Sequence, residues 1–489
     1  MPSQSEQNPP PALAAAPDDA RARAAQRRAS RLLFSFGTGG LTLAAIYYGY
    51  TANVEDPFHL QVGILILCLA VLPSLLWAKR GGAQLPLFEV LMLTTANAYA
   101  IPLLAGHEQL AQVPVEKISQ AGVAVVLYQL AAICTYYSVR GRPGSSPMFT
   151  REVISHDINR YIGYGLTITT IYTIITVFYD IIPYDVVGVT RAVFYGIGLV
   201  SVFVQARRWG LGDLGPTERT LFLLNMVIQV IIQFSTLFLV GGISITLLAF
   251  VGYVSGSRKI PVLAIVFMGA VTALLHNGKA PMRMIYWESA SNRIQPKFAE
   301  LPGFFFDWVQ YGISVENSGP DDKKMANKLL DRTSLFHLLC IVVSRTPEFQ
   351  PHLNGETYAQ IPAQFIPRFF WPDKPSAHKG SNTLAIYYGM QGQDDVAKTT
   401  VGFGTITEAY ANYGFFGIGL LGVLYGAVYR KIQLSTAKSP LLSYPGLLTI
   451  ILMAWSFQIE YTLSMWLSSM FQAIVAIMGI PFILRNFLG

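Results

Sequence analysis

Charged residues, cysteines and cofactor motifs are all scarce in this chain of 489 residues. Only 13% of the residues are charged, whereas a soluble domain carries about 25%, so the composition excludes an ordinary soluble protein. The three cysteines are Cys68, Cys134 and Cys340. Two of them lie in apolar stretches, which excludes a disulfide framework and a cysteine metal site. The histidines lack metal-ligand spacing, and neither a P-loop nor a dinucleotide fingerprint occurs, so we expect no metal and no other cofactor.

Long apolar stretches dominate instead. Hydrophobic residues make up 52% of the chain, and the mean hydropathy is +0.41. Each apolar stretch is close to the ~20 residues that cross a bilayer as a helix. We therefore expect an all-α polytopic membrane protein with about 12 transmembrane helices. The stretches are 32–50, 59–78, 85–105, 118–138, 161–182, 186–205, 220–239, 242–256, 260–276, 404–429, 441–459 and 461–484.

The sequence divides into four parts. Residues 1–30 are rich in Pro, Ala, Ser and Gln and then basic, which predicts a disordered cytoplasmic tail. Residues 31–276 hold the first nine predicted spans, and 404–489 hold the last three. Between them lies a long polar stretch, residues 277–403, which we call the outer segment. Residues 220–256 can be read as two helices or as one broken helix, with Gly241-Gly242 as the obvious turn.

The distribution of Lys and Arg orients the chain. The short loops on one side hold only Lys117 and Arg191, whereas those on the other side are rich in both residue types. Cytoplasmic loops carry the excess of basic residues. We therefore expect both termini in the cytoplasm and the outer segment on the opposite face, which in a bacterium is the periplasmic face of the inner membrane. The net charge of +7 follows from this topology, and we expect the lipid bilayer, not nucleic acid, as a partner.

The centre of the outer segment is an irregular aromatic stretch, Ile366 to Pro375. Its three prolines forbid a regular helix and a central strand. Arg368 and Lys374 lie among aromatic residues, including Trp371. This combination indicates a surface that binds an anion attached to an apolar or sugar-like group.

Three further features of this region are candidates for binding or catalysis. Lys279 and Arg283 lie at the outer membrane boundary, where they contact either lipid headgroups or a phosphate. Residues 321–345 have helical apolar spacing and predict an amphipathic helix that lies on the outer face or is docked into it. In this helix Arg332 makes a salt bridge or contacts a ligand. Glu408 and Asn412 are four residues apart and therefore share a helix face. Glu408 either lines a cavity or makes a capping hydrogen bond.

The motifs of this region resemble those of the bacterial oligosaccharide repeat-unit polymerases, the O-antigen polymerase or Wzy-type family. The resemblance covers about 90 residues and the topology. An Arg begins an apolar stretch, Arg332 to Val343, and Thr346-Pro347, Gly355 to Tyr358, Ile366 to Pro375 and Glu408 to Gly414 follow in the family's order.

The resemblance implies a reaction and a fold. A glycan carried on undecaprenyl diphosphate is transferred to the non-reducing end of another lipid-linked unit by a glycosyltransferase of GT-C-like fold that uses no nucleotide sugar. It also implies a flippase and a chain-length regulator of the same pathway as partners.

Applied to this chain, the reaction assigns roles to particular side chains. The departing diphosphate needs fixed cations, for which Arg283 and Arg368 are the leading candidates, assisted by Lys279 and Lys374. Glu408 or Asp373 is the candidate base for the attacking hydroxyl. Trp371 either stacks on sugar or anchors the loop. The candidate catalytic residues are therefore Glu408, Asp373 and Arg368, and the candidate binding residues are Arg283, Lys279, Arg332, Lys374, Trp371 and Asn412.

Three other functions compete with this hypothesis. A transporter or flippase of lipid-linked sugars would need polar groups through the membrane midplane, and the predicted spans carry few. An O-antigen ligase-like transferase usually has a His before its last Gly-x-x-Gly, where this chain reads Thr399-Thr400-Val401-Gly402. A non-catalytic scaffold would tolerate replacement of the loop arginines.

Overall fold

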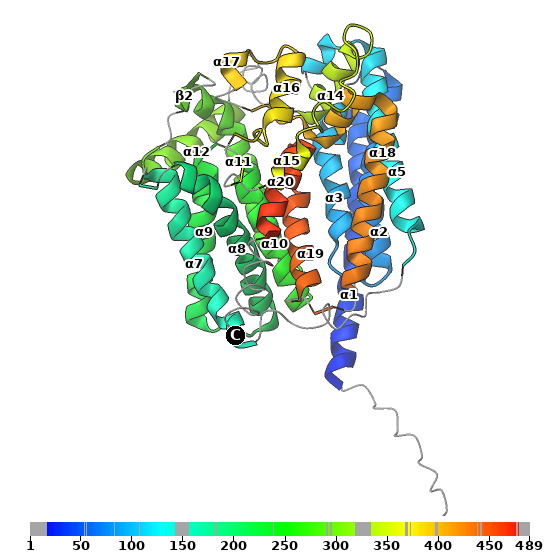
Figure 1. Cartoon of the computed structure of the whole chain (residues 1–489). Coiled ribbons are helices and arrows are strands. Elements are labelled where there is room, and N and C mark those ends of the chain that lie inside the picture. Colours follow the sequence, from blue (N-terminus) through cyan, green and yellow to red (C-terminus); the bar gives the residue numbers. More distant parts are fainter. Residues whose placement is uncertain are drawn as a thin grey trace, which may run out of the picture.

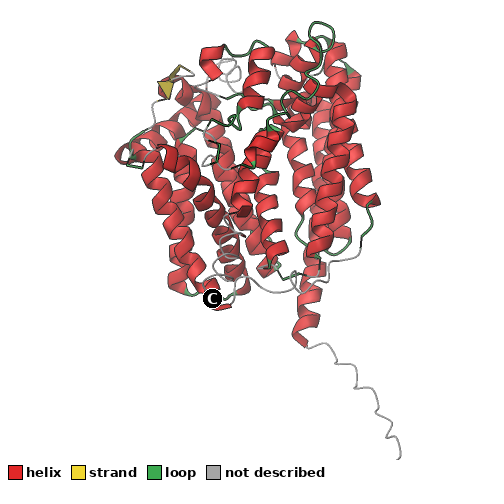
Figure 2. Cartoon of the chain, in the orientation of Figure 1, coloured by secondary structure: helices red, strands yellow, loops and turns green. Residues whose placement is uncertain are grey.

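The computed structural model is almost entirely helical in the part of the chain that it describes (Figure 2). One two-stranded ribbon, β1 (Trp287–Ser289) paired antiparallel with β2 (Asn292–Arg293), completes the described elements. The structure describes residues 17–52, 54, 56–82, 84–106, 108–141, 156–179, 181–182, 184–237, 239–289, 292–293, 296–317, 334–366, 370–371, 373–396, 400–437, 439–440, 443–475 and 478.

One helical bundle is built around the pair α5 and α18. It contains α1 (Pro17–Thr51), α2 (Pro57–Lys79), α3 (Leu87–Thr95), η1 (Ala96–Ala100), α4 (Ile101–Leu104), α5 (Val115–Ser138) and α18 (Gly404–Thr436), with η2 (Glu108–Gln112) before α5. A Cβ atom at Gly422 would lie 2.6 Å from the Tyr128 carbonyl oxygen, and one at Gly426 would lie 2.4 Å from that of Ala132. The two glycines therefore let α18 approach the backbone of α5 closely.

A second bundle holds α7 to α12, and two short helices join it to the first. Its members are α7 (His156–Phe178), α8 (Tyr184–Leu211), α9 (Pro216–Ser235), α10 (Leu239–Ser257), α11 (Val262–Tyr286) and α12 (Leu301–Asn317), which η3 (Phe298–Glu300) precedes. The joining helices are α19 (Tyr444–Ser456) and α20 (Leu463–Ile474). α19 contacts α3 and α18 on one side and α8 and α10 on the other.

Residues 220–256 form two helices. The chain turns at Thr236 and Leu237, where Leu237 has a φ of +59°, so the turn expected at Gly241-Gly242 is wrong. Both glycines lie inside α10. A Cβ atom at Gly242 would lie 2.4 Å from the Phe234 ring, so these glycines serve close packing of α10 on α9.

The outer segment lies at the end of the molecule opposite to the start of α1 (Figure 1). Its helices are α12, α14 (Leu335–Arg345), α15 (Ile361–Gln364), α16 (Lys379–Tyr387) and α17 (Gln393–Val396). α11 ends at Tyr286 rather than near residue 276, so Lys279 and Arg283 lie on a helix. Lys117 of α5 forms an ion pair with Glu348, which follows α14. This pair ties the outer segment to the first bundle.

Of two expectations of secondary structure, one is met in the described residues and the other needs correction. The amphipathic stretch 321–345 contains α14, but residues 318–333, including Arg332, lie outside the described part. α14 is capped by Ser334, whose hydroxyl accepts from the His337 N–H at 3.3 Å. Most of its side chains are buried, and the helix contacts α5 and α18, which agrees with the docked alternative. The expected disordered tail is helical from Pro17 onward, because its Ala and Arg residues favour helix.

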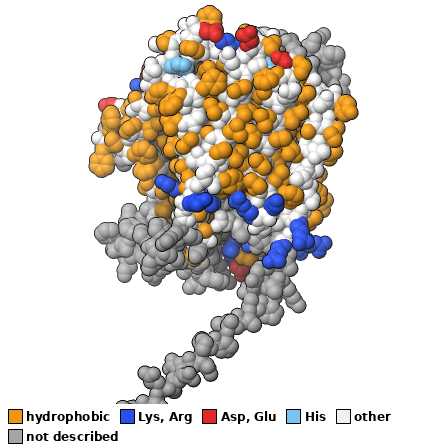
Figure 3. Space-filling view, turned by 90° about the vertical axis from the view of Figure 1, so that its right-hand side faces the viewer, with side chains coloured by type: hydrophobic (Ala, Val, Ile, Leu, Met, Phe, Trp, Pro, Cys, Tyr) orange, Lys and Arg blue, Asp and Glu red, His pale blue; other side chains and the backbone are white. Residues whose placement is uncertain are grey.

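Among the described residues, six helices are long and apolar enough to cross a membrane: Ser30–Thr51, Pro57–Lys79, Leu87–Leu104, Val115–Ser138, Val262–Lys279 and Gly404–Thr436. A helix lies at each of the other predicted stretches. The described part of α19 has 13 residues and that of α20 has 12, fewer than the ~20 of a full crossing. The apolar side chains form a band across the molecule, with Lys and Arg along one margin and carboxylates at the opposite end (Figure 3). The protein therefore has the surface of a membrane protein.

Candidate functional site

A kink in α18 creates the centre of the candidate site. Tyr413 (φ −141°, ψ 16°) and Gly414 (φ +59°, ψ −144°) leave the helical conformation. The carbonyl oxygens of Ala411 and Asn412 accept instead from the N–H groups of Leu353 and Asn354, at 3.0 and 3.2 Å. Gly414 suits this position because its φ is positive and the His352 ring lies 3.1 Å from where a Cβ atom would be.

Asn412 connects the kink to the Gly-x-Thr-Tyr motif. Its side-chain oxygen accepts from the Gly355 N–H at 2.9 Å. Its side-chain nitrogen donates to the Thr357 hydroxyl and to the Glu408 carbonyl oxygen, each at 2.8 Å. Asn412 and Thr357 are both completely buried. Two motifs more than 50 residues apart therefore form one hydrogen-bonded unit.

Glu408 extends this unit to α20. One carboxylate oxygen accepts from the Leu463 N–H, in the first turn of α20, at 2.6 Å. Thr357 also interacts with the carboxylate, and a Cβ atom on Gly380 of α16 would lie 3.5 Å from the other carboxylate oxygen. Glu408 is 0% exposed. Of the two roles open from sequence, this geometry favours capping, since the carboxylate binds a helix N-terminus. We call Gly355, Thr357, Glu408, Asn412 and Leu463 the α18 junction.

A carboxylate and two cations lie beside the α18 junction. The connection between α19 and α20 carries Glu460, whose carbonyl oxygen accepts from the Gly404 N–H at 3.0 Å. Burial raises the pKa of Glu460, and the neighbouring cations Lys279 and Arg283 partly oppose this rise. Arg283 also donates to the Leu237 carbonyl oxygen at 3.0 Å, so it stabilises the turn between α9 and α10.

Sequence reasoning missed Glu460, although a signal existed. It is the single residue between the last two predicted stretches, 441–459 and 461–484. A carboxylate in so short a connection is confined to one end of both helices. Such a position predicts contact with other charged groups at the same end.

Lys374 has a structural role in the aromatic stretch. Its buried ammonium group donates to the carbonyl oxygens of Ile366 at 2.6 Å and Gln364 at 3.3 Å. The Gln364 side chain donates to the Pro375 carbonyl oxygen at 3.0 Å. These bonds close the base of a loop that exposes Trp371 and Asp373 to solvent. Arg368 belongs to this loop and lies outside the described residues.

The predicted residues therefore fall into separate groups. Glu408 and Asn412 meet in the α18 junction, as their spacing predicts. Lys279 and Arg283 meet near Glu460, whereas Trp371, Asp373 and Lys374 belong to the closed loop. Arg332 and Arg368 lie outside the described part. Within that part, the structure contains no group of three or more His, Cys, Asp or Glu residues able to hold a metal.

Comparison with known proteins places the chain in a family. A family model described as "Domain of unknown function (DUF8712)" matches residues 219–487. Neither a curated protein nor a solved structure matches the chain. The matched region begins in the first turn of α9 and contains α10 to α20, and with them the outer segment, the α18 junction and Glu460. Because the match covers more than half of the residues, the chain belongs to the DUF8712 family.

Proposed function

We propose that this protein polymerises oligosaccharide repeat units carried on undecaprenyl diphosphate. In this proposal it is a GT-C-like glycosyltransferase with twelve spans, both termini in the cytoplasm and the outer segment at the periplasmic face of a bacterial inner membrane. A flippase supplies the lipid-linked units, and a chain-length regulator acts on the same chain.

The α18 junction is the observation that supports this proposal best. Gly355 to Tyr358 and Glu408 to Gly414 are two of the motifs that resemble those of the repeat-unit polymerases. They are far apart in sequence, yet Asn412 bonds directly to Gly355 and Thr357. Because both motifs belong to one buried hydrogen-bonded unit, we infer that together they hold the outer segment in one position over α18.

The cations supply the chemistry that the reaction needs. Negative charge grows on the diphosphate oxygen as the glycosidic bond breaks, and fixed cations at a poorly hydrated edge stabilise it. Lys279 and Arg283 fit this role, with Glu460 as their resting counter-ion. In this proposal Arg368 is a further cation, and its guanidinium can hold the diphosphate through two parallel hydrogen bonds. Lys374 contributes by holding the closed loop.

The two candidate bases differ in their access to substrate. A general base must come within hydrogen-bond reach of the proton that it removes. Glu408 is fully buried and bonded to Leu463, whereas Asp373 is exposed on the closed loop. We therefore assign the base role to Asp373 and a positioning role to Glu408.

The test is polymerisation by the purified protein in nanodiscs, given its lipid-linked repeat unit and no nucleotide sugar. We expect a ladder of longer lipid-linked glycans. Arg368→Ala should abolish the ladder, whereas Lys379→Ala, which removes an exposed cation from α16 in the same segment, should preserve it. Equal ladders from both variants would remove Arg368 from the site. Absence of any ladder, with movement of the lipid-linked sugar between leaflets, would establish a transporter instead.

A further inference from the structure

A cluster of basic residues lies at the end of the first bundle where α1 begins. Its members come from the end of α2, from the chain just after α5 and from the last two turns of α18, and α2 and α18 both contact α5. Lys and Arg side chains follow the lower margin of the apolar band on this side of the molecule (Figure 3). In the described part of the chain, we call the following residues the basic cluster: Lys79, Arg80, Arg140, Arg430 and Lys431. The proposed polymerase reaction makes no use of them.

Two arginines of the basic cluster are positioned by tyrosine rings of α5. The guanidinium of Arg80 lies 4.8 Å from the centre of the Tyr137 ring, and that of Arg430 lies 5.4 Å from the centre of the Tyr136 ring. Arg430 also donates from Nε to the Val139 carbonyl oxygen at 3.3 Å. Such contacts restrict both side chains before any ligand binds, which lowers the entropy cost of binding.

Arg140 lies close to the end of α18. A Cβ atom at Gly141, the next residue, would lie 3.0 Å from the Leu434 side chain. One turn earlier on α18, Arg430 bonds to Val139. The chain after α5 therefore runs along the last turns of α18, which brings Arg140 beside the two cations of that helix.

The basic cluster has an excess of positive charge. Among α2, α3, α5 and α18, the acidic residue at this end is Glu89 of α3, which interacts electrostatically with Arg80 and Arg430. Glu89 is 3% exposed, and no ion pair joins it to either arginine within the described residues. Five positive charges and one negative charge leave a net charge of +4, which attracts an anion.

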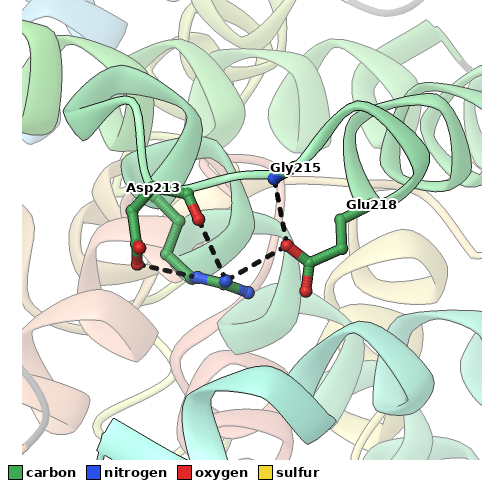
Figure 4. A network of polar contacts seen from close by, with 4 residues as sticks. Asp213, Gly215 and Glu218 are labelled. Carbon is green, nitrogen blue, oxygen red and sulfur yellow. Dashed lines mark hydrogen bonds and ion pairs between the residues drawn. The ribbon is translucent and has the colours of Figure 1, made fainter.

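The second bundle shows the opposite arrangement at the same end of the molecule. The guanidinium of Arg208 on α8 lies 3.2 Å from the Glu218 carboxylate and 3.3 Å from that of Asp213 (Figure 4). The charge of Arg208 is therefore balanced inside the protein. The excess charge of the basic cluster lacks such carboxylates on its own helices, so it needs a partner from outside the chain.

An apolar surface leads to the basic cluster. Leu420, Leu424 and Val428 of α18 are 54%, 48% and 39% exposed, and their spacing of four residues places them on one helix face. Lys431 is exposed and follows one turn later on the same face. An apolar column that ends among cations matches the acyl chain and the phosphate of a phospholipid.

We propose that the basic cluster binds one anionic phospholipid from the leaflet on the side where α1 begins. The phosphate lies among Arg140, Arg430 and Lys431, and an acyl chain packs along Leu424 and Val428. Each basic residue near the surface adds to the attraction for anionic lipids, so a lipid with a net negative charge is preferred to a zwitterionic one. This site is independent of the polymerase proposal, because it lies at the end of the molecule opposite to the outer segment (Figure 1).

The test is native mass spectrometry of the full-length protein, purified in a mild detergent and offered equal amounts of phosphatidylglycerol and phosphatidylethanolamine with the same acyl chains. We expect one retained phosphatidylglycerol, preferred by about tenfold or more. Arg140→Ala together with Lys431→Ala removes two exposed cations and should lower this retention by about tenfold or more. Arg258→Ala together with Lys259→Ala is the matched control, because it removes the same charge from the connection between α10 and α11. The control should retain the lipid.

Three results would overturn the proposal: equal retention of both lipids, no retained lipid, or an equal loss of retention in the two double variants. Gel filtration establishes whether each variant is folded. If the variant of Arg140 and Lys431 is not, Lys431→Gln removes one exposed charge and should lower retention of phosphatidylglycerol by about fivefold. Unchanged retention in that single variant would likewise overturn the assignment.

Discussion

Glu408 and Asp373 carry the same functional group in opposite surroundings. Glu408 is buried and bonded to the backbone of α20, and Asp373 is exposed on a loop. Sequence spacing placed Glu408 beside Asn412 but left its burial open, because burial depends on Thr357, Gly380 and Leu463, which come from three other segments.

This contrast gives a prediction for polymerisation. Asp373→Asn should lower the rate by about 10²–10⁴, the usual contribution of a general base. Glu408→Gln keeps an oxygen for the Leu463 N–H, so its rate should fall by less than about tenfold and its pH profile should not move. The measurement is the rate of ladder formation against pH. A large loss in Glu408→Gln with normal activity in Asp373→Asn would reverse the two assignments.

Glu460 gives a prediction for stability against pH. Its folded pKa is raised above the ordinary value of 4.5, chiefly by burial, so the folded state holds this proton to higher pH than the unfolded chain does. Its contribution to stability is therefore largest below 4.5 and falls as the pH rises through the folded pKa. As the pH rises through the folded pKa, the melting temperature of the wild type should fall relative to that of Glu460→Gln. A rise of the wild-type melting temperature relative to the variant would contradict a raised pKa for Glu460.

At the scale of elements, sequence predicted the helices better than their interruptions. Apolar runs predicted α18, and the structure shows that Gly422 and Gly426 permit its close packing on α5. The kink at Tyr413-Gly414 and the turn at Leu237 left no periodic signal. Both depend on partners distant in sequence, namely Leu353 and Asn354 for the kink and Arg283 for the turn.

Close packing of α18 on α5 gives a matched pair of substitutions. Gly426→Val should destabilise the protein by about 1–3 kcal/mol, the usual cost of overpacking, because its Cβ atom would lie 2.4 Å from the Ala132 carbonyl oxygen. Gly419→Val is the control, since nothing lies within 4 Å of its Cβ position on the same helix. Thermal unfolding in detergent measures both. Equal losses of stability in the two variants would show that the close contact between Gly426 and α5 does not cause the destabilisation.

At the scale of the whole molecule, the distribution of Lys and Arg predicts sidedness. The outer segment and the start of α1 lie at opposite ends (Figure 1), and basic residues follow one margin of the apolar band (Figure 3). A membrane-impermeant maleimide added to intact spheroplasts should label Phe370→Cys, since Phe370 is 75% exposed. Ser439→Cys, which follows α18, should react only after lysis. The reverse pattern would invert the proposed topology.

In the proposed polymerase, the outer segment and α18 act as one unit through the bond between Thr357 and Asn412. The most direct measurement is a double-mutant cycle on the initial rate of ladder formation, with Thr357→Val, Asn412→Ala and both together. If the two residues act through one interaction, each single substitution slows polymerisation and the pair is slower than the worse single variant by less than about threefold. Losses that multiply in the double variant would show independent action and contradict the account.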